Sequence, residues 1–289
     1  MTMHFYKYHG AGNDFILVDN RKIVIPEEKL SLAAVNLCHR NFGIGADGLM
    51  LIEDSENADI KFRIFNPDGS EAEMCGNGIR CFAKHVYDFG IVTIPEIKVE
   101  TLAGVLSVNV VESGEVSHIK VDMGKPRLDR GNIPAAGEGK IISERLDNGR
   151  EISAVNTGVP HVVTFAKNID SIDVCGIGRK IRYNKIFPEG INVNFLEKTG
   201  ENKFKIRTYE RGVENETLAC GTGITASAVI AYLLGEARGE RIEVDAKGGR
   251  VFVELEVDGK EVKKAYMIGP AEMVFDGDIV ESKFLREKK

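Results

Sequence analysis

The sequence predicts an α+β fold that is built mostly on antiparallel sheet. Short segments rich in β-branched residues, with partly alternating polarity, outnumber helical patterns along the 289 residues. Turn-forming groups such as NPDG, ESG, KGG and VDG separate these segments at short intervals. A long internal repeat also indicates that one fold occurs twice in the chain. These three observations together predict two similar domains, each dominated by sheet.

The strand and helix patterns can be placed along the chain. Six segments of five to seven residues carry the clearest strand pattern, and they are 15–19, 49–53, 61–65, 97–101, 105–111 and 251–257. Helical periodicity is found in four places only, at 27–39, 78–89, 171–182 and 223–234. Because strands outnumber helices and do not alternate regularly with them, a parallel α/β sheet is disfavoured.

Composition indicates a soluble protein and excludes several classes of partner. Hydrophobic residues make up 43% of the chain and charged residues 28%, which is typical of a globular protein with a core of ordinary size. The net charge is −6 and Lys and Arg are dispersed, so we expect no nucleic-acid partner. The opening MTMHFYKYHG has no apolar segment, and no apolar run approaches the roughly 18–20 residues of a membrane span. We therefore expect a cytoplasmic protein with no membrane partner.

The internal repeat is the most informative feature of the sequence. CGNGIRCFAKHVYDFG, residues 75–90, aligns without a gap on CGTGITASAVIAYLLG, residues 220–235. The same register continues, so that 13 of the 50 positions from 75 to 124 are identical to those 145 residues later. This is several times the number expected by chance. The repeat predicts two copies of one domain and makes Cys75 and Cys220 structural equivalents.

Each of these two cysteines is predicted to lie at the start of a helix. A helix N-terminus carries N–H groups without intrahelical acceptors and about half a positive charge, which favours thiolate over thiol. This effect is worth up to roughly 2 kcal/mol, enough to move a thiol pKa from about 8.5 towards about 7. A thiol with such a pKa accepts or donates a proton at physiological pH. The glycines that follow each cysteine let a ligand approach the backbone closely.

Two such thiols facing each other across a cleft would form a proton-transfer pair. Repulsion between two thiolates predicts one thiolate and one thiol in the resting state. A carbon acid between them would lose a proton to one sulfur and gain a proton on its opposite face from the other, which inverts a stereocentre. The N–H groups at the helix starts would hold the substrate carboxylate and stabilise the charge that develops on it. These N–H groups belong to Gly76, Asn77, Gly221 and Thr222.

Other roles for the cysteines are less favoured by the pattern. Five cysteines at irregular spacing argue against a disulfide framework. No CxxC pair or HxxxH spacing suggests zinc, so we expect no metal. Cys81 is Ala226 in the second copy, which argues against a redox role shared with Cys75. We therefore expect Cys38, Cys81 and Cys175 to be small core residues.

One glycine motif also has a structural interpretation. GIGADG, residues 43–48, formally fits the GxGxxG pattern of dinucleotide-binding loops. It follows a predicted helix and precedes a predicted strand, which is the reverse of the order in a dinucleotide-binding unit. We interpret it as a turn.

Five motifs occur together and in order along the chain. They are HGAGNDFILVD (9–19), GIGADGL (43–49), FNPDGSEAEMCGNGIRCFA (65–83), YERGVENETLACGTG (209–223) and GPAEMVFDGDI (269–279). In these motifs the chain resembles the diaminopimelate epimerase family along essentially its whole length, and the resemblance is specific because the motifs occur together. Proline racemase-like relatives share the fold and the cysteine pair but typically differ around both cysteine motifs.

This resemblance implies a fold, an activity and an assembly. The fold is two pseudosymmetric domains, residues 1–123 with 271–289 and residues 124–270, each a barrel-like sheet around a central helix with the site at their interface. The activity is interconversion of LL- and meso-2,6-diaminopimelate without a cofactor. This reaction belongs to lysine biosynthesis and, in bacteria that use it, to the synthesis of peptidoglycan precursors. The implied assembly is a homodimer that acts on a small molecule.

The resemblance also assigns roles to individual residues. Cys75 and Cys220 match the catalytic cysteines, while His161 and Glu210 match residues thought to tune their pKa values. The residues that match the binders of substrate carboxylate, amino groups and the distal end are Asn13, Asn66, Gly76, Asn77, Asn192, Glu210, Arg211, Gly221 and Thr222. A substrate with two ammonium and two carboxylate groups needs such neutral amides, one anion and one guanidinium.

Two positions depart from the family pattern. Many members have asparagine at the position of Val159, and some have glutamine at the position of Gly48. Each replacement removes a polar contact, and the asparagine missing at Val159 belongs to recognition of the distal end of the substrate.

Two rival functions stay open at the level of sequence. One is a racemase of another amino acid on the same fold, of the proline or hydroxyproline type. The other is a thiol redox switch without enzymatic activity, in which the two cysteines form a disulfide.

Overall fold

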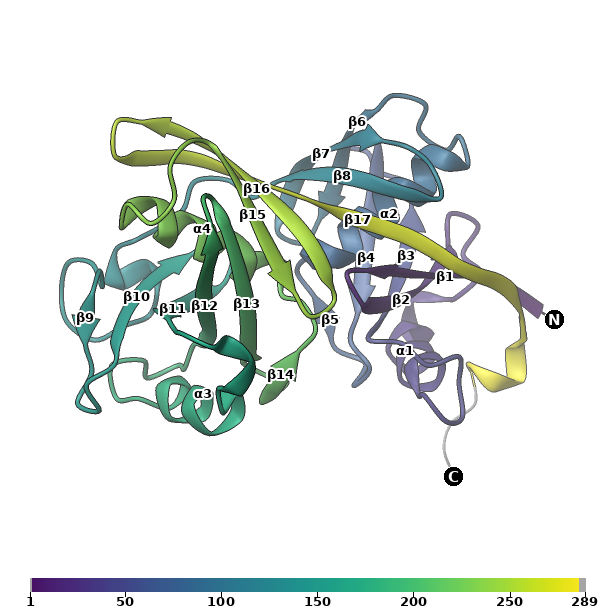
Figure 1. Ribbon diagram of the computed structural model, residues 1–289. Coiled ribbons are helices and arrows are strands. Elements are labelled where there is room, and N and C mark those ends of the chain that lie inside the picture. The colour runs from purple at the N-terminus through teal and green to yellow at the C-terminus, as the bar shows by residue number, and fades with distance from the viewer. Residues whose placement is uncertain (1, 286–289) are drawn as a thin grey trace. The chain divides into compact units, whose positions relative to one another are not determined.

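The structure is a computed structural model that describes residues 2–285. Contacts within the chain divide it into two units. The first contains the residues up to Val121 and those from Gly269 onward, and the second is Asp122–Ile268. The boundaries expected from the sequence lie two residues later in the chain at both points. Figure 1 labels the elements of both units.

The first unit is a sheet with two α-helices. Its strands are β1 (Thr2–Gly10), β2 (Asn13–Asp19), β3 (Gly48–Glu53), β4 (Ile60–Phe65), β5 (Glu71–Ala72), β6 (Glu96–Thr101), β7 (Gly104–Glu112), β8 (Val116–Asp122) and the C-terminal part of β17 (Glu261–Val280). Its helices are α1 (Leu30–Cys38) and α2 (Gly76–Asp88), with 3-10 turns η1 (Glu27–Lys29) and η4 (Glu281–Lys283). The first five residues of GIGADG lie in the loop between α1 and β3, and its last glycine, Gly48, begins β3, so the interpretation of this motif as a turn is confirmed.

The second unit contains the same kinds of element. Its strands are β9 (Glu144–Arg145), β10 (Glu151–Asn156), β11 (Pro160–Phe165), β12 (Asn192–Gly200), β13 (Lys203–Glu210), β14 (Asn215–Thr217), β15 (Arg241–Ala246), β16 (Gly249–Asp258) and the N-terminal part of β17. Its helices are α3 (Val174–Arg182) and α4 (Gly221–Leu233), with 3-10 turns η2 (Arg130–Asn132) and η3 (Ile169–Ser171).

Strand pairing follows the same order in the two units. β2 runs parallel to β3, which pairs antiparallel with β4, and β11, β12 and β13 repeat this arrangement. β4 then pairs antiparallel with β5 and parallel with β6, as β13 does with β14 and β15. The hairpin β6–β7 corresponds to β15–β16. The repeat in the sequence is therefore a repeat of topology, and the predicted α+β fold of two sheet-dominated domains is confirmed.

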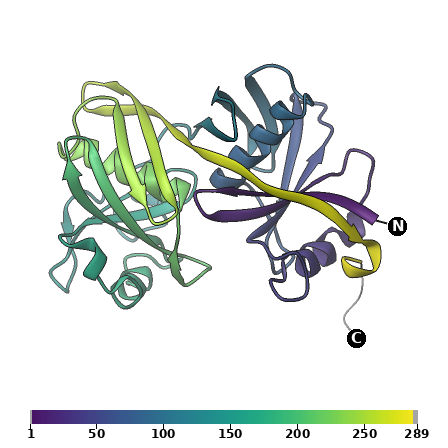
Figure 2. The ribbon, with the colours of Figure 1, turned by 45° about the vertical axis from the view of Figure 1, so that its right-hand side comes forward.

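The second helix of each unit is central to that unit. α2 contacts β1, β2, β3, β4 and β7, and α4 contacts β10, β11, β12, β15 and β16. Figure 2 shows the strands of each unit around its helix. α4 is GTGITASAVIAYL, which has no charged residue, as expected for a helix that is surrounded by its own sheet. Both helices begin two residues before the apolar periodicity that predicted them, because their first turn is made of glycine and a small polar residue.

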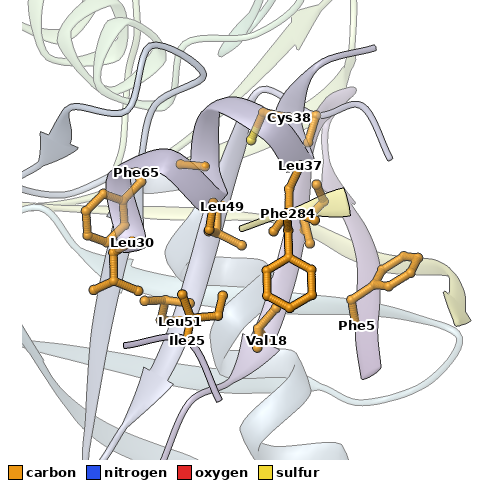
Figure 3. Close-up of a cluster of buried hydrophobic side chains, with 14 of the residues drawn as sticks. Phe5, Val18, Ile25, Leu30, Leu37, Cys38, Leu49, Leu51, Phe65 and Phe284 are labelled. Atoms are coloured by element: carbon orange, nitrogen blue, oxygen red, sulfur yellow. The ribbon is translucent and has the colours of Figure 1, made fainter. Parts of the chain in front are cut away.

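The C-terminal segment is anchored to the first unit by a hydrophobic cluster (Figure 3). Phe284 is buried beside α1, and the backbone oxygen of Phe284 accepts a hydrogen bond of 3.1 Å from Asn36 Nδ2. Leu37 of α1 and Leu49 of β3 belong to the same cluster. Burying a phenylalanine side chain stabilises a protein by about 1.5–3 kcal/mol. This packing explains why residues after Gly269 belong with the N-terminal part of the chain.

Three cysteines were expected in the core, and two of them are there. Cys38 and Cys81 are buried, so these predictions are confirmed. The prediction for Cys175 is wrong, because its side chain is exposed and its Sγ lies 3.0 Å from Asn215 Oδ1. α3 packs through Val174, Gly178 and Ile181, which leaves position 175 on the outer face of the helix. In the described part of the chain, none of the helices has the length and apolarity to cross a membrane.

Candidate active site

The start of α2 places Cys75 as the N-cap residue of the helix. Its backbone is extended, with φ −135° and ψ 118°, and its Sγ accepts a hydrogen bond of 3.4 Å from the Gly78 N–H. Gly76 and Asn77 take the first two helical positions, where N–H groups have no acceptor within the helix. A Cβ on Gly78 would lie 3.2 Å from Met50 Sδ and 3.4 Å from Cys75 Cβ. Glycine at this position therefore lets the cysteine end of the helix lie close to the sheet.

Asn13 and Asn77, two predicted substrate-binding residues, form a side-chain hydrogen bond beside Cys75. Asn13 Oδ1 accepts a hydrogen bond of 3.1 Å from Asn77 Nδ2 and lies 3.9 Å from Cys75 Sγ. Asn13 Nδ2 donates to Asp47 Oδ2 at 2.7 Å, and Asp47 in turn pairs with Arg40 at 2.6 Å. The carboxylate thus fixes the orientation of the Asn13 amide, whose oxygen faces the thiol and the Asn77 side chain.

Arg80 is a residue near Cys75 that sequence reasoning missed. Its side chain is fully buried one turn into α2. Nη1 donates to Asn77 Oδ1 at 3.0 Å and to Gly76 O at 3.3 Å, and Nε donates to Pro270 O at 3.2 Å. Burial lowers the pKa of Arg80, while the neighbouring thiols Cys81 and Cys75 act in the opposite direction. An arginine keeps its proton throughout the physiological range, so a cation lies behind the first turn of α2.

The start of α4 repeats this backbone geometry around Cys220. Cys220 is again an extended N-cap, with φ −122° and ψ 106°, and its carbonyl accepts the Ile224 N–H at 2.9 Å. Gly221 and Thr222 take the first two helical positions. A Cβ on Gly223 would lie 2.4 Å from Asn194 Oδ1. Here glycine is required because a polar side chain of β12 approaches the helix.

A chain of hydrogen bonds connects Cys220 to the interior of the second unit. Cys220 Sγ lies 3.4 Å from Thr222 Oγ1, which lies 2.9 Å from His161 Nε2. His161 Nδ1 lies 3.2 Å from Asn194 Nδ2, and Asn194 Oδ1 accepts from Thr208 Oγ1 at 2.9 Å. The structure therefore brings together Cys220, His161 and Thr222, which the sequence had singled out.

His161 is uncharged in this environment. It is fully buried in β11, and this burial, helped by the positive charge of Arg211, lowers its pKa from 6.5 to about 3. Asn194 and Thr208 complete its surroundings and were missed from the sequence. One signal pointed to Asn194: it lies two residues after Asn192 in a strand, so both side chains are on the same face.

Other predicted binding residues are engaged within the protein. Asn192 is buried; its Nδ2 donates to Pro160 O at 2.9 Å, and its Oδ1 accepts the Arg211 N–H at 2.8 Å. Asn192 therefore orients the turn that carries Arg211. Asn66 Nδ2 donates to Ser70 Oγ at 3.0 Å across the turn that follows β4. Glu210 is the last residue of β13 and is half-buried.

The two departures from the family pattern have different surroundings. Gly48 is buried at the start of β3, and a Cβ there would lie 3.2 Å from Phe65 O and 3.4 Å from Phe15 Cδ1. A glutamine would need these neighbours to move. Val159 is 38% exposed in the connection between β10 and β11.

Comparison with solved structures identifies the fold. A phenazine biosynthesis protein of the PhzF family from Bacillus anthracis matches with a TM-score of 0.72 over 97% of this chain and 99% of that chain. The sequences are 20% identical, so this likeness concerns the fold alone.

Curated proteins with similar sequences define the class of this enzyme. The similar curated proteins are isomerases that act as epimerases, and this chain is an enzyme of that class. The family model for diaminopimelate epimerase matches residues 5–128 and 153–274. A diaminopimelate epimerase from Methanocella arvoryzae is 49% identical over 95% of this chain and 96% of its own length. Another from Methanothrix thermoacetophila is 51% identical over 95% of both chains. The chain therefore belongs to the diaminopimelate epimerase family.

Proposed function

We propose that the protein interconverts LL- and meso-2,6-diaminopimelate, as a step of lysine biosynthesis, with Cys75 and Cys220 as the two proton-transfer groups and without a cofactor. Membership of the family supports the substrate. The observation that carries the mechanism is that two equivalent central helices each begin with an N-cap cysteine followed by two N–H groups that have no intrahelical acceptor.

The chemistry follows from what a helix start provides. A thiolate removes the α-proton, and the electron pair of the C–H bond passes into the carboxylate to form an enolate-like species. The N–H groups of Gly76, Asn77, Gly221 and Thr222 bind this carboxylate and stabilise its added charge. The second cysteine donates its S–H proton to the opposite face of the carbon. The first sulfur ends as a thiol and the second as a thiolate, so the pair is ready for the reverse reaction.

The resemblance to the family assigns recognition of the distal end of the substrate to several polar residues. The Arg211 guanidinium suits a bidentate contact with the distal carboxylate. Asn192 supports this role because it holds the backbone N–H of Arg211 at 2.8 Å. Asn13, Asn66 and Glu210 would bind the ammonium groups and the rest of the distal end. His161 and Glu210 are proposed to tune the cysteine pKa values.

Two further properties are part of this proposal. A homodimer is expected from the resemblance to the family, and a cytoplasmic location is expected from the apolar pattern of the sequence. Light scattering coupled to gel filtration measures the first: a mass near twice 31.8 kDa supports it and a mass near 31.8 kDa contradicts it.

The substrate is tested by hydrogen exchange at the α-carbon. The protein is incubated with LL-diaminopimelate in deuterated water, with proline and trans-4-hydroxyproline as parallel controls. We expect deuterium at the α-position of diaminopimelate, formation of the meso isomer and no exchange in either control. Exchange in proline or hydroxyproline with none in diaminopimelate would refute the proposed substrate.

A second measurement separates the enzyme from a redox switch. We expect activity under reducing conditions and its loss when Cys75 and Cys220 are bridged by an oxidant. A protein that is inactive in both states would instead favour the redox role.

A further inference from the structure

We infer that the Thr222 hydroxyl donates a hydrogen bond to the sulfur of Cys220, and that Thr222 thereby acts as a positioning residue that favours the thiolate form of Cys220 before substrate binds. The inference rests on the proposed role of Cys220 as a proton-transfer group. It concerns the second unit alone and follows from the direction of four consecutive hydrogen bonds.

The side-chain amide of Asn194, which is fully buried in β12, sets the donor and acceptor roles along these hydrogen bonds. Its Nδ2 lies 2.9 Å from Val162 O, and its Oδ1 lies 2.9 Å from Thr208 Oγ1. The reverse orientation of the amide would place two carbonyl oxygens against each other at Val162, so the nitrogen must face the β11 backbone. The second proton of Nδ2 is then directed to His161 Nδ1, 3.2 Å away.

This arrangement determines which nitrogen of His161 carries a proton. Burial lowers the pKa of His161 to about 3, so the ring is neutral and has a single N–H at physiological pH. Since Nδ1 accepts a hydrogen bond from Asn194, the proton must be on Nε2. Nε2 then donates to Thr222 Oγ1 at 2.9 Å.

The hydrogen bond from His161 determines where the Thr222 hydroxyl directs its own proton. A hydroxyl has one proton, and because Oγ1 accepts from His161 this proton is directed elsewhere. Cys220 Sγ lies 3.4 Å from Oγ1, within hydrogen-bond distance for sulfur. The Thr222 backbone is held in place, since its carbonyl accepts from Thr157 Oγ1 at 2.8 Å. A sulfur that accepts a hydrogen bond is more stable as a thiolate, because the bond strengthens when the acceptor is charged.

Other charges near α4 do not replace this interaction. Arg211 and Glu210 lie at the end of β13, and the charge of Arg211 acts on the His161 ring. On the strands that contact α4, charged side chains pair with one another or bind backbone. They are Glu197 with the Asn168 N–H, Lys198 with Glu236, Arg241 with Glu254, Arg250 with Asp245 and Glu243, and Asp258 with Lys263. Glu256 accepts a hydrogen bond from the Tyr266 hydroxyl, and Glu151 of β10 is exposed.

The test is the pH dependence of alkylation of Cys220 in the full-length, reduced, substrate-free protein. Iodoacetamide is applied between pH 5 and 10, and the modified peptides that contain Cys220 and Cys75 are quantified separately by mass spectrometry. We expect Thr222→Val to raise the pH midpoint for Cys220 by about one unit, equivalent to a tenfold loss of thiolate below the midpoint. Thr222→Ser, which keeps the hydroxyl, should retain the wild-type midpoint.

The outcome is independent of the proposed function, because no substrate is present. Circular dichroism and thermal melting check the fold of each variant, and Thr222→Ala removes the same hydroxyl if the valine variant does not fold. An unchanged Cys220 midpoint in the variants without the hydroxyl, or an equal shift in Thr222→Ser, would overturn the inference. A purely steric role for Thr222 predicts no such dependence on the hydroxyl.

Discussion

The helix starts at Cys75 and Cys220 have the same backbone but different electrostatic surroundings. Both cysteines are extended N-caps that are followed by glycine at the first and third helical positions. Behind Cys75 lies the buried guanidinium of Arg80, whose repeat equivalent is Thr225. Thr225 Oγ1 instead donates to Gly221 O at 3.0 Å. Beside Cys220 lies a neutral hydrogen-bond chain that runs through Thr222 and His161 to Asn194.

The difference shows that structural equivalence does not make the two thiols chemically equivalent. The N-terminal charge of the helix is common to both cysteines, since it depends only on the backbone. A cation acts on its surroundings at any physiological pH, whereas a neutral hydrogen-bond chain acts only through contact and orientation. Two separate means of stabilising a thiolate suit a reaction in which each sulfur must take either protonation state in turn.

The strongest test of the comparison is removal of either thiol. Cys75→Ala and Cys220→Ala should each lower epimerase turnover by at least about 10³-fold, because general acid–base groups contribute about 10²–10⁴-fold and each direction needs both. Turnover is measured by NMR from both stereoisomers, and Cys175→Ala, an exposed position, is the control. Full turnover in either the Cys75→Ala or the Cys220→Ala variant would refute the proposed two-base mechanism.

Acid titration should reveal one buried histidine in each unit. Burial lowers the pKa of His161 to about 3 and that of His85 in α2 to about 4, from 6.5. Below pH 6.5 the unfolded chain binds protons that the folded protein does not, so stability falls with decreasing pH. Each histidine contributes up to about 1.4 kcal/mol per pH unit once the pH is well below 6.5, which amounts to roughly 2 kcal/mol for both between pH 6.5 and 5.5.

Urea unfolding at these two pH values measures the effect. His85→Gln keeps a hydrogen-bonding group beside Tyr8 and should halve the fall in the free energy of unfolding between pH 6.5 and 5.5. A free energy of unfolding that is the same at both pH values would show that the two rings do not stay neutral.

Substituting the third helical position should distinguish the two helix starts sterically. Gly223→Ala places Cβ 2.4 Å from Asn194 Oδ1, whereas the nearest atom at Gly78 is Met50 Sδ at 3.2 Å, on a flexible side chain. We expect Gly223→Ala to lose about 1–3 kcal/mol of stability and Gly78→Ala to lose less. Thermal melting of both variants checks this order, which the reverse ranking would contradict.

The smallest expected effect concerns the cation behind Cys75. Arg80→Met should raise the alkylation midpoint of Cys75 by about one pH unit while that of Cys220 stays in place, since a nearby cation favours thiolate. Arg80→Lys keeps the positive charge but not the planar guanidinium, so its Cys75 midpoint should lie between those of Arg80→Met and the wild type. An equal shift at both cysteines would mean that Arg80 acts through the fold in general.

Local features were accessible from the sequence. The duplication, the α+β class, the helix-start cysteines and family membership follow from spacing and motifs within short windows. The error at Cys175 arose because exposure in a helix as short as α3 depends on which face packs. α3 buries Val174 and Ile181 and leaves position 175 outside.

The partners of the site residues follow from tertiary contacts. The amino-acid sequence alone was enough to predict two copies of one unit, each with a cysteine at the start of a helix, because helix starts and repeats are visible in the order of neighbouring residues. It did not reveal that Asn194 determines which nitrogen of His161 carries a proton, or that Arg80 contacts Asn77 beside Cys75. The parallel pairing of β11 with β12, in which His161 lies opposite Asn192, brings residues 33 positions apart into hydrogen-bond contact. Such contacts depend on strand register and on burial by distant segments, which only the folded chain defines.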